Sequence, residues 1–385
     1  MDIRRITQEQ DAQQYLNLCK YCFPNSNNWI DHMLPLPEHD LVFGGFRAGA
    51  LQAATVSKSF SASLFGQNVG MNGIGAVVSA PEGRNSGCVR EVLAHVLRHE
   101  RERGMLVSAL YPFLFRFYEK MGYGYIGGMA AYTFKPEDIS AFTISGACIP
   151  VASSDHVEAM IRVHNQFVRQ YDFGIDFTDD IAKYLERLTP SGPYAYIYRN
   201  SGGETRGYLE YRLIEIGSFS KNMQIERFGY LDAEAFQALL AFIRSHRGQC
   251  AEVTMPVPDN VPLRHIFQEP RVKVEPHANW MGRPLDVEAV LRLRLAFEPC
   301  EREIAFSVED PILDQNTGTY TLQGTTVMKS AHSGRQAVPF AVFSSLLFHA
   351  MTFEQAYYAG KIGWHDEAAA HYFSRKGAIY VSAEF

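Results

Sequence analysis

Residues 77–96 read VVSAPEGRNSGCVREVLAHV, and this stretch decides how the chain folds. An apolar strand over residues 73–80 runs into a short turn, and a helix with one apolar face follows directly. Backbone N–H groups at a helix N-terminus have no partner inside the helix, and the helix dipole adds partial positive charge there. Such a turn can hold a pyrophosphate, with Gly87 allowing close approach and with Arg84 and Arg90 adding charge. A plain glycine turn between two elements gives the same pattern, so this stretch alone leaves both interpretations open.

A second stretch, residues 109–125, reads ALYPFLFRFYEKMGYGY and favours the phosphate-binding interpretation. It predicts a strand, then a short helix that carries Phe117 and Tyr118, and then Met121–Tyr123. At this distance behind the first turn, the pattern resembles the GNAT superfamily of acetyl-CoA-dependent N-acetyltransferases. The resemblance implies that the pyrophosphate of acetyl-CoA lies on the first turn and that Tyr118 protonates the departing CoA thiolate.

The rest of the chain surrounds these stretches with alternating elements. Strands and helices alternate over about the first 140 residues, and residues 150–285 repeat the same order of elements. From about residue 286, apolar and polar residues alternate between turn signals, and helices follow. We expect an α/β (α+β) fold with tandem GNAT-like mixed sheets flanked by helices and a C-terminal sterol-carrier-like α/β domain. The predicted domains are a GNAT acetyl-CoA-binding catalytic domain (1–145), a degenerate second GNAT-like domain (146–285) and a sterol-carrier-protein-like domain (286–385).

Four local patterns give further expectations. Thr7 and Gln10 form a capping-box pattern that opens a helix. Residues 340–360 are strongly apolar and predict a helix, and residues 378–385, AIYVSAEF, predict a closing strand. In the second GNAT-like segment, the strand MQIERFGYL is followed by DAEA and a helix, with no phosphate-binding turn. We therefore expect that copy to be structural and to bind no CoA.

The whole chain resembles one family more closely. Two tandem GNAT-like segments, a sterol-carrier-like domain and a final phenylalanine are together similar to the enhanced intracellular survival (Eis) family. The resemblance implies direct transfer of acetyl groups to amines of cationic substrates such as aminoglycosides, and a hexamer of identical chains. It also implies a general base that is the C-terminal carboxylate, here that of Phe385. By position, the implied CoA contacts are Val77, Val78, Ser79, Arg84, Asn85, Ser86, Gly87, Cys88, Val89, Arg90, Phe113 and Leu114.

The sequence departs from the family pattern at two places in the turn. Asn85 and Ser86 stand where the family is often richer in arginine, and Val89 stands where the general motif has Gly or Ala. Both changes put the strength of CoA binding in doubt, although a backbone cradle does not depend on side-chain identity.

The terminal carboxylate makes chemical sense as a base only if it is buried. An α-carboxyl group titrates near about 3.5, which makes it a weak base towards an alkylammonium group. Burial beside the ring of Phe385 and near Glu384 would raise its pKa. Glu384 is also expected to hold a polycationic substrate, and Trp29 either walls the substrate channel or fills the core.

Composition excludes several other classes of function. The net charge is -6, from 36 Lys and Arg against 42 Asp and Glu, which does not favour a nucleic-acid partner. The charged N-terminus lacks the apolar segment of a signal peptide, and no apolar run is long enough to span a membrane. Six scattered cysteines fit reduced thiols in the cytoplasm. A metal site would need further ligands at suitable spacing beside the pair Cys19 and Cys22 or the pair His95 and His99. The sequence offers none, so we expect no metal.

Two rivals to the aminoglycoside hypothesis stay open. The acceptor can instead be a protein lysine or a polyamine, with the same acetyl-CoA site. Alternatively, the chain is a non-enzymatic lipid- or sterol-binding protein with a vestigial acetyltransferase site. The sequence does not identify the physiological acceptor.

Overall fold

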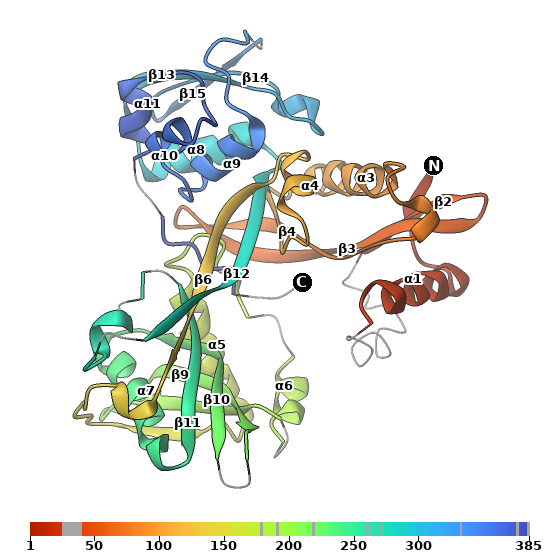
Figure 1. Ribbon diagram of the computed structural model, residues 1–385. Coiled ribbons are helices and arrows are strands. Elements are labelled where there is room, and N and C mark those ends of the chain that lie inside the picture. The colour runs from red at the N-terminus through yellow and green to blue at the C-terminus, as the bar shows by residue number, and fades with distance from the viewer. Residues whose placement is uncertain are drawn as a thin grey trace. The chain divides into compact units, whose positions relative to one another are not determined.

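In the computed structural model the chain forms two compact units, and each is described by itself (Figure 1). Unit 1 comprises Met1–Gly127 and Asn279–Gly377, and unit 2 comprises Gly128–Ala278 and Ala378–Ser382. The residues that the structure describes are 1–24, 41–177, 180–189, 192–217, 220–258, 260–261, 263–269, 272–331, 333–374 and 377–382.

Unit 1 is built on a mixed sheet with the strand order β1-β2-β3-β4-β5-β12. Only β4 and β5 are parallel neighbours, and the other pairs are antiparallel. Successive side chains of a strand point to opposite faces, so Val42 packs under α1 whereas Phe43 packs under α3. The elements are β1 (Asp2–Arg5), α1 (Glu9–Cys22), β2 (Leu41–Arg47), β3 (Ala50–Leu64), β4 (Gln67–Ser79), η1 (Pro81–Gly83), α3 (Cys88–Glu102), β5 (Val107–Leu110), α4 (Phe115–Glu119), β6 (Gly124–Phe134) and β12 (Lys273–Pro284).

A buried chain of hydrogen bonds ties α3 to the middle strands of this sheet. Ser57 on β3 donates to the carboxylate of Glu100 (2.7 Å), and Asn72 on β4 donates to the Ser57 hydroxyl (2.7 Å). Ser108 on β5 donates to the Asn72 amide oxygen (2.9 Å), and its hydroxyl lies 2.7 Å from that of Tyr123. Each polar group here has a partner, which buried polar groups require. Burial raises the pKa of Tyr123 to about 12.

The C-terminal part of unit 1 is a small three-stranded meander covered by helices. β13, β14 and β15 pair antiparallel in sequence order, as the alternating pattern predicts. Arg294 is fully buried, donates to the carbonyl oxygens of Leu346 and Leu347, and has its guanidinium over the rings of Tyr372 and Phe373. The elements are α8 (Val287–Phe297), β13 (Cys300–Val308), η5 (Asp314–Asn316), β14 (Gly318–Gly324), β15 (Thr326–Ser330), α9 (Phe340–Leu347), α10 (Phe353–Tyr358) and α11 (Glu367–Tyr372).

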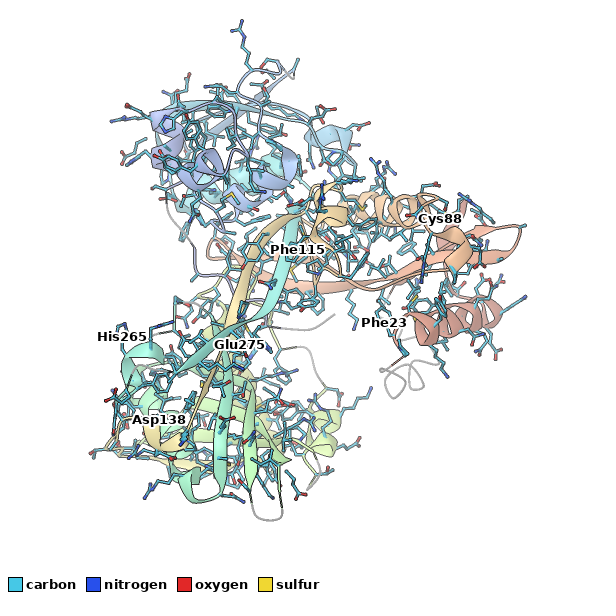
Figure 2. All side chains as sticks on the ribbon, in the orientation of Figure 1. Phe23, Cys88, Phe115, Asp138, His265 and Glu275 are labelled. Carbon is cyan, nitrogen blue, oxygen red and sulfur yellow. The ribbon has the colours of Figure 1, made fainter. Side chains whose placement is uncertain are left out.

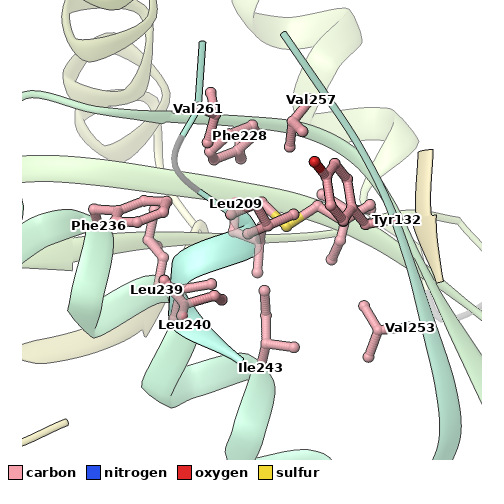
Figure 3. Packing of buried hydrophobic residues seen from close by; sticks show 14 of the residues in the cluster. Tyr132, Leu209, Phe228, Phe236, Leu239, Leu240, Ile243, Val253, Val257 and Val261 are labelled. Carbon is pink, nitrogen blue, oxygen red and sulfur yellow. The ribbon is translucent and has the colours of Figure 1, made fainter. Parts of the chain in front are cut away.

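Unit 2 repeats the strand plan of unit 1. Its sheet has the order β6-β11-β10-β9-β8-β7, and again one pair, β10 and β11, is parallel. The core beside α7 contains Leu209, Phe228, Leu239 and Val257 (Figure 3). The elements are η2 (Pro136–Asp138), β7 (Ala147–Pro150), α5 (Ser154–Val168), α6 (Ile181–Arg187), β8 (Tyr194–Arg199), β9 (Thr205–Glu215), β10 (Lys221–Tyr230), α7 (Ala233–Ser245), η3 (His246–Gly248), β11 (Cys250–Pro258) and η4 (Leu263–Ile266).

The strand next to each parallel pair comes from a distant part of the chain. In unit 1, β5 pairs with Met281–Pro284 of β12, which follows unit 2 in sequence. In unit 2, β11 pairs with Met129–Phe134 of β6, which lies in the predicted first GNAT-like domain and precedes the other strands of unit 2. The compact units therefore do not divide at residues 145 and 285, and the three-domain division stays a prediction.

Three local expectations were wrong. The first helix begins at Glu9 with Gln8 as N-cap and no side-chain cap, so Thr7 and Gln10 form no capping box. Residues 340–360 form two helices, because His349 takes a left-handed φ of 60° and Thr352 then caps α10.

The closing segment is the third, since residues 378–382 form no strand. Ile379 makes one isolated β-bridge to Asp172, and the backbone N–H of Tyr380 donates to the Asp172 carbonyl oxygen (3.1 Å). Phe173, with a φ of 63°, turns the partner segment away, so a longer ladder cannot form. The Ser382 hydroxyl closes the contact by bonding both the N–H and the carbonyl oxygen of Ile175 at 3.0 Å.

Candidate active site

The candidate site begins where the two parallel strands of unit 1 separate. β4 and β5 pair from Met71 with Val107 to Ile74 with Leu110, and β5 then ends. β4 continues against β3 with an irregular register, and Ala76 takes a left-handed φ of 43°. A bulge at this point bends the strand and turns backbone groups away from the ladder.

The turn after β4 leads into an uncapped helix. After η1, Asn85 and Gly87 both have positive φ, 58° and 84°, and Gly87 is the N-cap of α3. No side chain caps this helix end, so its first N–H groups are available to a ligand. A Cβ placed on Gly87 would meet no atom within 4 Å, so the space in front of the helix is open. The Ser86 hydroxyl donates to the carbonyl oxygen of Gly83 (2.6 Å) and closes the turn.

A cleft of about 870 Å³ connects the separated strands, the turn and α4. This volume is typical of a site for a small molecule or cofactor. Figure 2 labels Cys88 at the start of α3 and Phe23 after α1, which both line the cleft. The lining residues are Cys22, Phe23, Ile74, Gly75, Ala76, Val77, Ser79, Gly83, Arg84, Asn85, Gly87, Cys88, Val89, Arg90, Tyr111, Phe113, Phe117 and Tyr118.

Tyr118 lies at the inner end of this cleft. Only 1% of its surface is exposed, and its ring lies edge-on to Phe113 (5.3 Å), Phe117 (5.0 Å) and Tyr123 (6.0 Å between centroids). Burial, and then the neighbouring Tyr123, raise the pKa of Tyr118 well above its ordinary value. The group therefore stays protonated across the neutral range and can donate a proton.

Most of the predicted CoA contacts meet in the cleft. Val77, Ser79, Arg84, Asn85, Gly87, Cys88, Val89, Arg90 and Phe113 all line it. Ser86 and Leu114 are exposed beside it, and Val78 is buried in the core under α1. The backbone N–H of Ala80 donates to the carbonyl oxygen of Gln52 on β3. In an antiparallel ladder, every second residue of a strand points its N–H to the same neighbouring strand, so the Val78 N–H also points to β3. Trp29, Glu384 and Phe385 lie outside the described residues.

Sequence reasoning missed several lining residues. Tyr111, at the end of β5, is 55% exposed and packs edge-on against Trp280, which comes from β12. Its position at the carboxyl end of a strand was a usable signal. Cys22 and Phe23 at the end of α1 carried no such signal, because only the packing of α1 against β4 brings them to the cleft.

In the described ranges, no group of three or more His, Cys, Asp and Glu residues could hold a metal ion. All six cysteines are free thiols. Among the helices that the structure describes, none has both the length and the apolar character to cross a membrane.

Known families match three segments of the chain. Residues 2–126 match one acetyltransferase (GNAT) domain family, and residues 179–293 match another. Residues 287–380 match the sterol carrier protein domain. The chain carries two GNAT acetyltransferase domains in tandem. The predicted fold, tandem GNAT domains followed by a sterol-carrier-like domain, is confirmed.

Solved structures share the fold of this tandem GNAT chain over its whole length. A probable N-acyltransferase from Enterococcus faecalis is 21% identical with a TM-score of 0.83, covering 100% of this chain and 99% of that one. A GCN5-related N-acetyltransferase from Anabaena variabilis is 21% identical with a TM-score of 0.84, covering 99% and 98%. Eis1 from Mycobacterium abscessus is 19% identical with a TM-score of 0.81, covering all of both chains. No curated protein sequence matches the tandem GNAT chain.

Proposed function

We propose that this tandem GNAT enzyme transfers acetyl groups from acetyl-CoA directly to amines of cationic small molecules, in the manner of the Eis family. The observation that carries the proposal is the continuity of the cleft, from the uncapped start of α3 at Gly87 to the hydroxyl-bearing ring of Tyr118. GNAT domains use acetyl-CoA, and the residues here fit it. The helix end suits the pyrophosphate, and the separated strands suit the pantetheine arm.

The first chemical need is a donor for the charge that develops on the thioester oxygen. The sequence predicts this donor as a backbone N–H near Val78, at the end of the strand over residues 73–80, but the N–H of Val78 itself faces β3. Val77 lines the cleft beside the bulge at Ala76, and we assign the donor role to its N–H.

The proton transfers balance in a single displacement. The neutral amine attacks the thioester carbonyl, so the C–N bond forms as the C–S bond breaks. Tyr118 donates its phenolic proton to the departing sulfur, and its raised pKa keeps that proton available at neutral pH. We assign removal of the amine proton to the terminal carboxylate of Phe385, with Glu384 and Trp29 contacting the acceptor. The resemblance to the Eis family supports these three roles.

The wider proposal also rests on the resemblance. It comprises aminoglycosides as acceptors, a homohexamer, a cytoplasmic location and a second GNAT domain that binds no CoA. The last point has support in unit 2, where Asp232 accepts a hydrogen bond from the Ala235 N–H at the start of α7 (2.8 Å). A helix end that is already filled by a carboxylate does not attract a phosphate.

The test of function is release of CoA thiol from acetyl-CoA with a panel of aminoglycosides, polyamines and a lysine peptide. The Tyr118→Phe variant should retain acetyl-CoA binding and lose roughly a hundredfold or more in kcat, as expected when a general acid is removed. Tyr111→Phe, another cleft tyrosine, serves as the matched control. Equal kcat for Tyr118→Phe and the native enzyme would remove Tyr118 from the mechanism.

The same panel identifies the acceptor and tests the base. Turnover of the lysine peptide alone would favour the protein-lysine rival, and no saturable acetyl-CoA binding would favour the lipid-binding rival. A chain extended by one glycine after Phe385 should lose activity while it keeps folding and CoA binding. Unchanged activity would show that another group takes the amine proton.

A further inference from the structure

A separate cavity lies in the C-terminal part of unit 1, between the end of β13, the start of α9 and the loop after α10 (Figure 1). Its volume is about 440 Å³, which is within the range of sites for small molecules. Among the described residues, it shares none of its lining with the cleft that leads to Tyr118. The cavity is therefore not a part of the proposed acetyl-CoA site.

The floor of this cavity is apolar and buried. Val338 and Phe340 line it, and each is only 5% exposed. Ser307 also lines it and is fully buried, but its hydroxyl is already satisfied, 2.8 Å from the Thr319 hydroxyl and 3.1 Å from the Ser333 hydroxyl. A polar ligand group would lose its hydrogen bonds to water at this floor, so the floor suits an apolar group.

Backbone hydrogen bonds hold one wall of the cavity in place. The N–H of Val338 donates to the carbonyl oxygen of Ser307 (2.9 Å), which ties the segment before α9 to β13. The indole N–H of Trp364 donates to the carbonyl oxygen of Ala337 (3.0 Å), which ties the same segment to the loop after α10.

The Phe340 ring is held from the side of the transferase domain. A Cβ placed on Gly122, in the turn after the helix of Tyr118, would lie 2.7 Å from this ring. The Arg283 guanidinium lies over the ring, 5.1 Å from its centroid, and the Ser344 hydroxyl donates to the Gly122 carbonyl oxygen (2.9 Å). The cavity is thus formed before a ligand arrives, which reduces the ordering that binding requires.

The rim of the cavity carries two opposite charges that do not meet. Glu309, after β13, and Lys361, after α10, both line the cavity and are exposed. Within the described ranges, neither forms an ion pair with the other or with a third residue. The rim therefore offers one anionic and one cationic group to a ligand above an apolar floor.

A free α-amino acid has the matching chemistry. Its ammonium and carboxylate groups are attached to one carbon atom, and its side chain projects away from both. The ammonium group suits Glu309, the carboxylate suits Lys361, and an apolar side chain suits the floor at Phe340. A peptide fits less well, because its terminal charges lie at opposite ends of the chain.

We propose that this cavity binds a free α-amino acid with an apolar side chain, held at the rim by Glu309 and Lys361. The site goes beyond the proposed function, because no step of acetyl transfer uses it. The bound amino acid would rest on Phe340, which packs against the turn after the helix of Tyr118.

The experiment is an NMR titration of the full chain, without acetyl-CoA, with L-leucine and L-phenylalanine as probes. Both should bind saturably with a Kd of about 1 mM or lower, as expected for ligands of this size. N-acetyl-L-leucine lacks the ammonium group and L-leucinamide lacks the carboxylate. Each should bind at least about tenfold more weakly than L-leucine, because one charge-assisted hydrogen bond is lost.

Variants of the rim assign each charge of the ligand to its partner. Lys361→Gln should weaken binding of L-leucine about tenfold and leave that of L-leucinamide unchanged. Glu309→Gln should weaken binding of L-leucine likewise and leave that of N-acetyl-L-leucine unchanged. Lys329→Gln and Glu303→Gln are the matched controls, since both residues are exposed on the meander outside the cavity lining, and both variants should bind as the native chain does. Thermal melting checks that each variant folds.

Two results would overturn the inference. One is the absence of saturable binding of both amino acids to the native chain. The other is an equal loss of L-leucine binding in the rim variants and in their controls. Because the titration contains no acetyl-CoA, either result leaves the transferase proposal standing.

Discussion

Two strand-to-helix junctions, β4–α3 in unit 1 and β10–α7 in unit 2, follow the same backbone plan. In each, a parallel pairing stops partway along the strand, after Ile74 with Leu110 in one and after Gln224 with Thr254 in the other. In each, the strand then shows an irregular register against its antiparallel neighbour. The sequence elements that make a GNAT site are therefore present twice in outline.

The two junctions differ in what fills them. At the first, Gly87 leaves the helix end uncapped and the separated strands border a cleft. At the second, Asp232 caps α7 and pairs with Arg206 (2.8 Å), and Phe228 and Val257, beyond the parallel pairing, are buried in the core (Figure 3). The comparison teaches that one N-cap residue and a few core side chains decide whether this backbone offers a ligand site or satisfies itself.

The largest effect is expected when the first junction receives a carboxylate like the one that caps the second. Gly87→Asp places a negative charge where the pyrophosphate is expected, and a like charge about 4 Å away costs about 4 kcal/mol near a protein surface. Acetyl-CoA affinity should fall roughly a thousandfold by calorimetry. Gly87→Asn is the matched control, since both residues carry the same strain at a φ of 84°. Similar losses in the two variants would mean that shape, and not charge, governs this end of the helix.

The second prediction uses alkali to compare the two units. Burial raises the pKa of Tyr123 in unit 1 and of Tyr380 in unit 2 from 10.0 to about 12. The contribution of each buried, neutral tyrosine to the free energy of unfolding is fully present below pH 10. It is lost as the pH rises through about 12, because the same tyrosine ionises first in the unfolded chain. Each group should cost about 3 kcal/mol of unfolding free energy over that range.

Urea unfolding between pH 8 and 12 provides the measurement. Tyr123→Phe and Tyr380→Phe should each reduce the slope of unfolding free energy against pH by about 1.4 kcal/mol per unit. Unit 2 should lose its protection from proteolysis first, since more of the described buried tyrosines with raised pKa lie there: Tyr171, Tyr184, Tyr198, Tyr208, Tyr211, Tyr230 and Tyr380. Earlier cleavage of unit 1 would contradict this ranking.

The smallest effect is expected when the second junction is opened. Asp232→Ala removes the cap of α7 and should lower the unfolding free energy by about 1 kcal/mol, without creating a second acetyl-CoA site. Asp232→Asn keeps an acceptor for the Ala235 N–H and removes only the half-exposed pair with Arg206, so it should cost less. Urea titration gives the stability and calorimetric stoichiometry gives the number of sites. Two bound acetyl-CoA molecules per chain would show that the cap alone had closed the second site.

Much of the site could be predicted from the sequence because its signals are local. The apolar run of β4, the glycine at the N-cap and the face of α3 are contiguous in residues 73–96, and the helix that carries Tyr118 follows soon after. The same locality explains the failures. Nothing near Thr7 shows that the helix starts one residue later, and residues 340–360 look like one helix because His349 gives no sign of its left-handed backbone.

The local sequence sets the element order, the glycine turn before α3 and the position of Tyr118 on α4, since each depends on neighbours within one supersecondary unit. Only the tertiary structure decided which strand completes each sheet, because β12 and β6 reach their partners β5 and β11 from distant parts of the chain. It also decided that Cys22, Phe23 and Tyr111 border the cleft and that Arg90 and Arg98 face Pro311 and Ile312. These contacts join residues far apart in sequence, and their free energy comes from packing that no local pattern encodes.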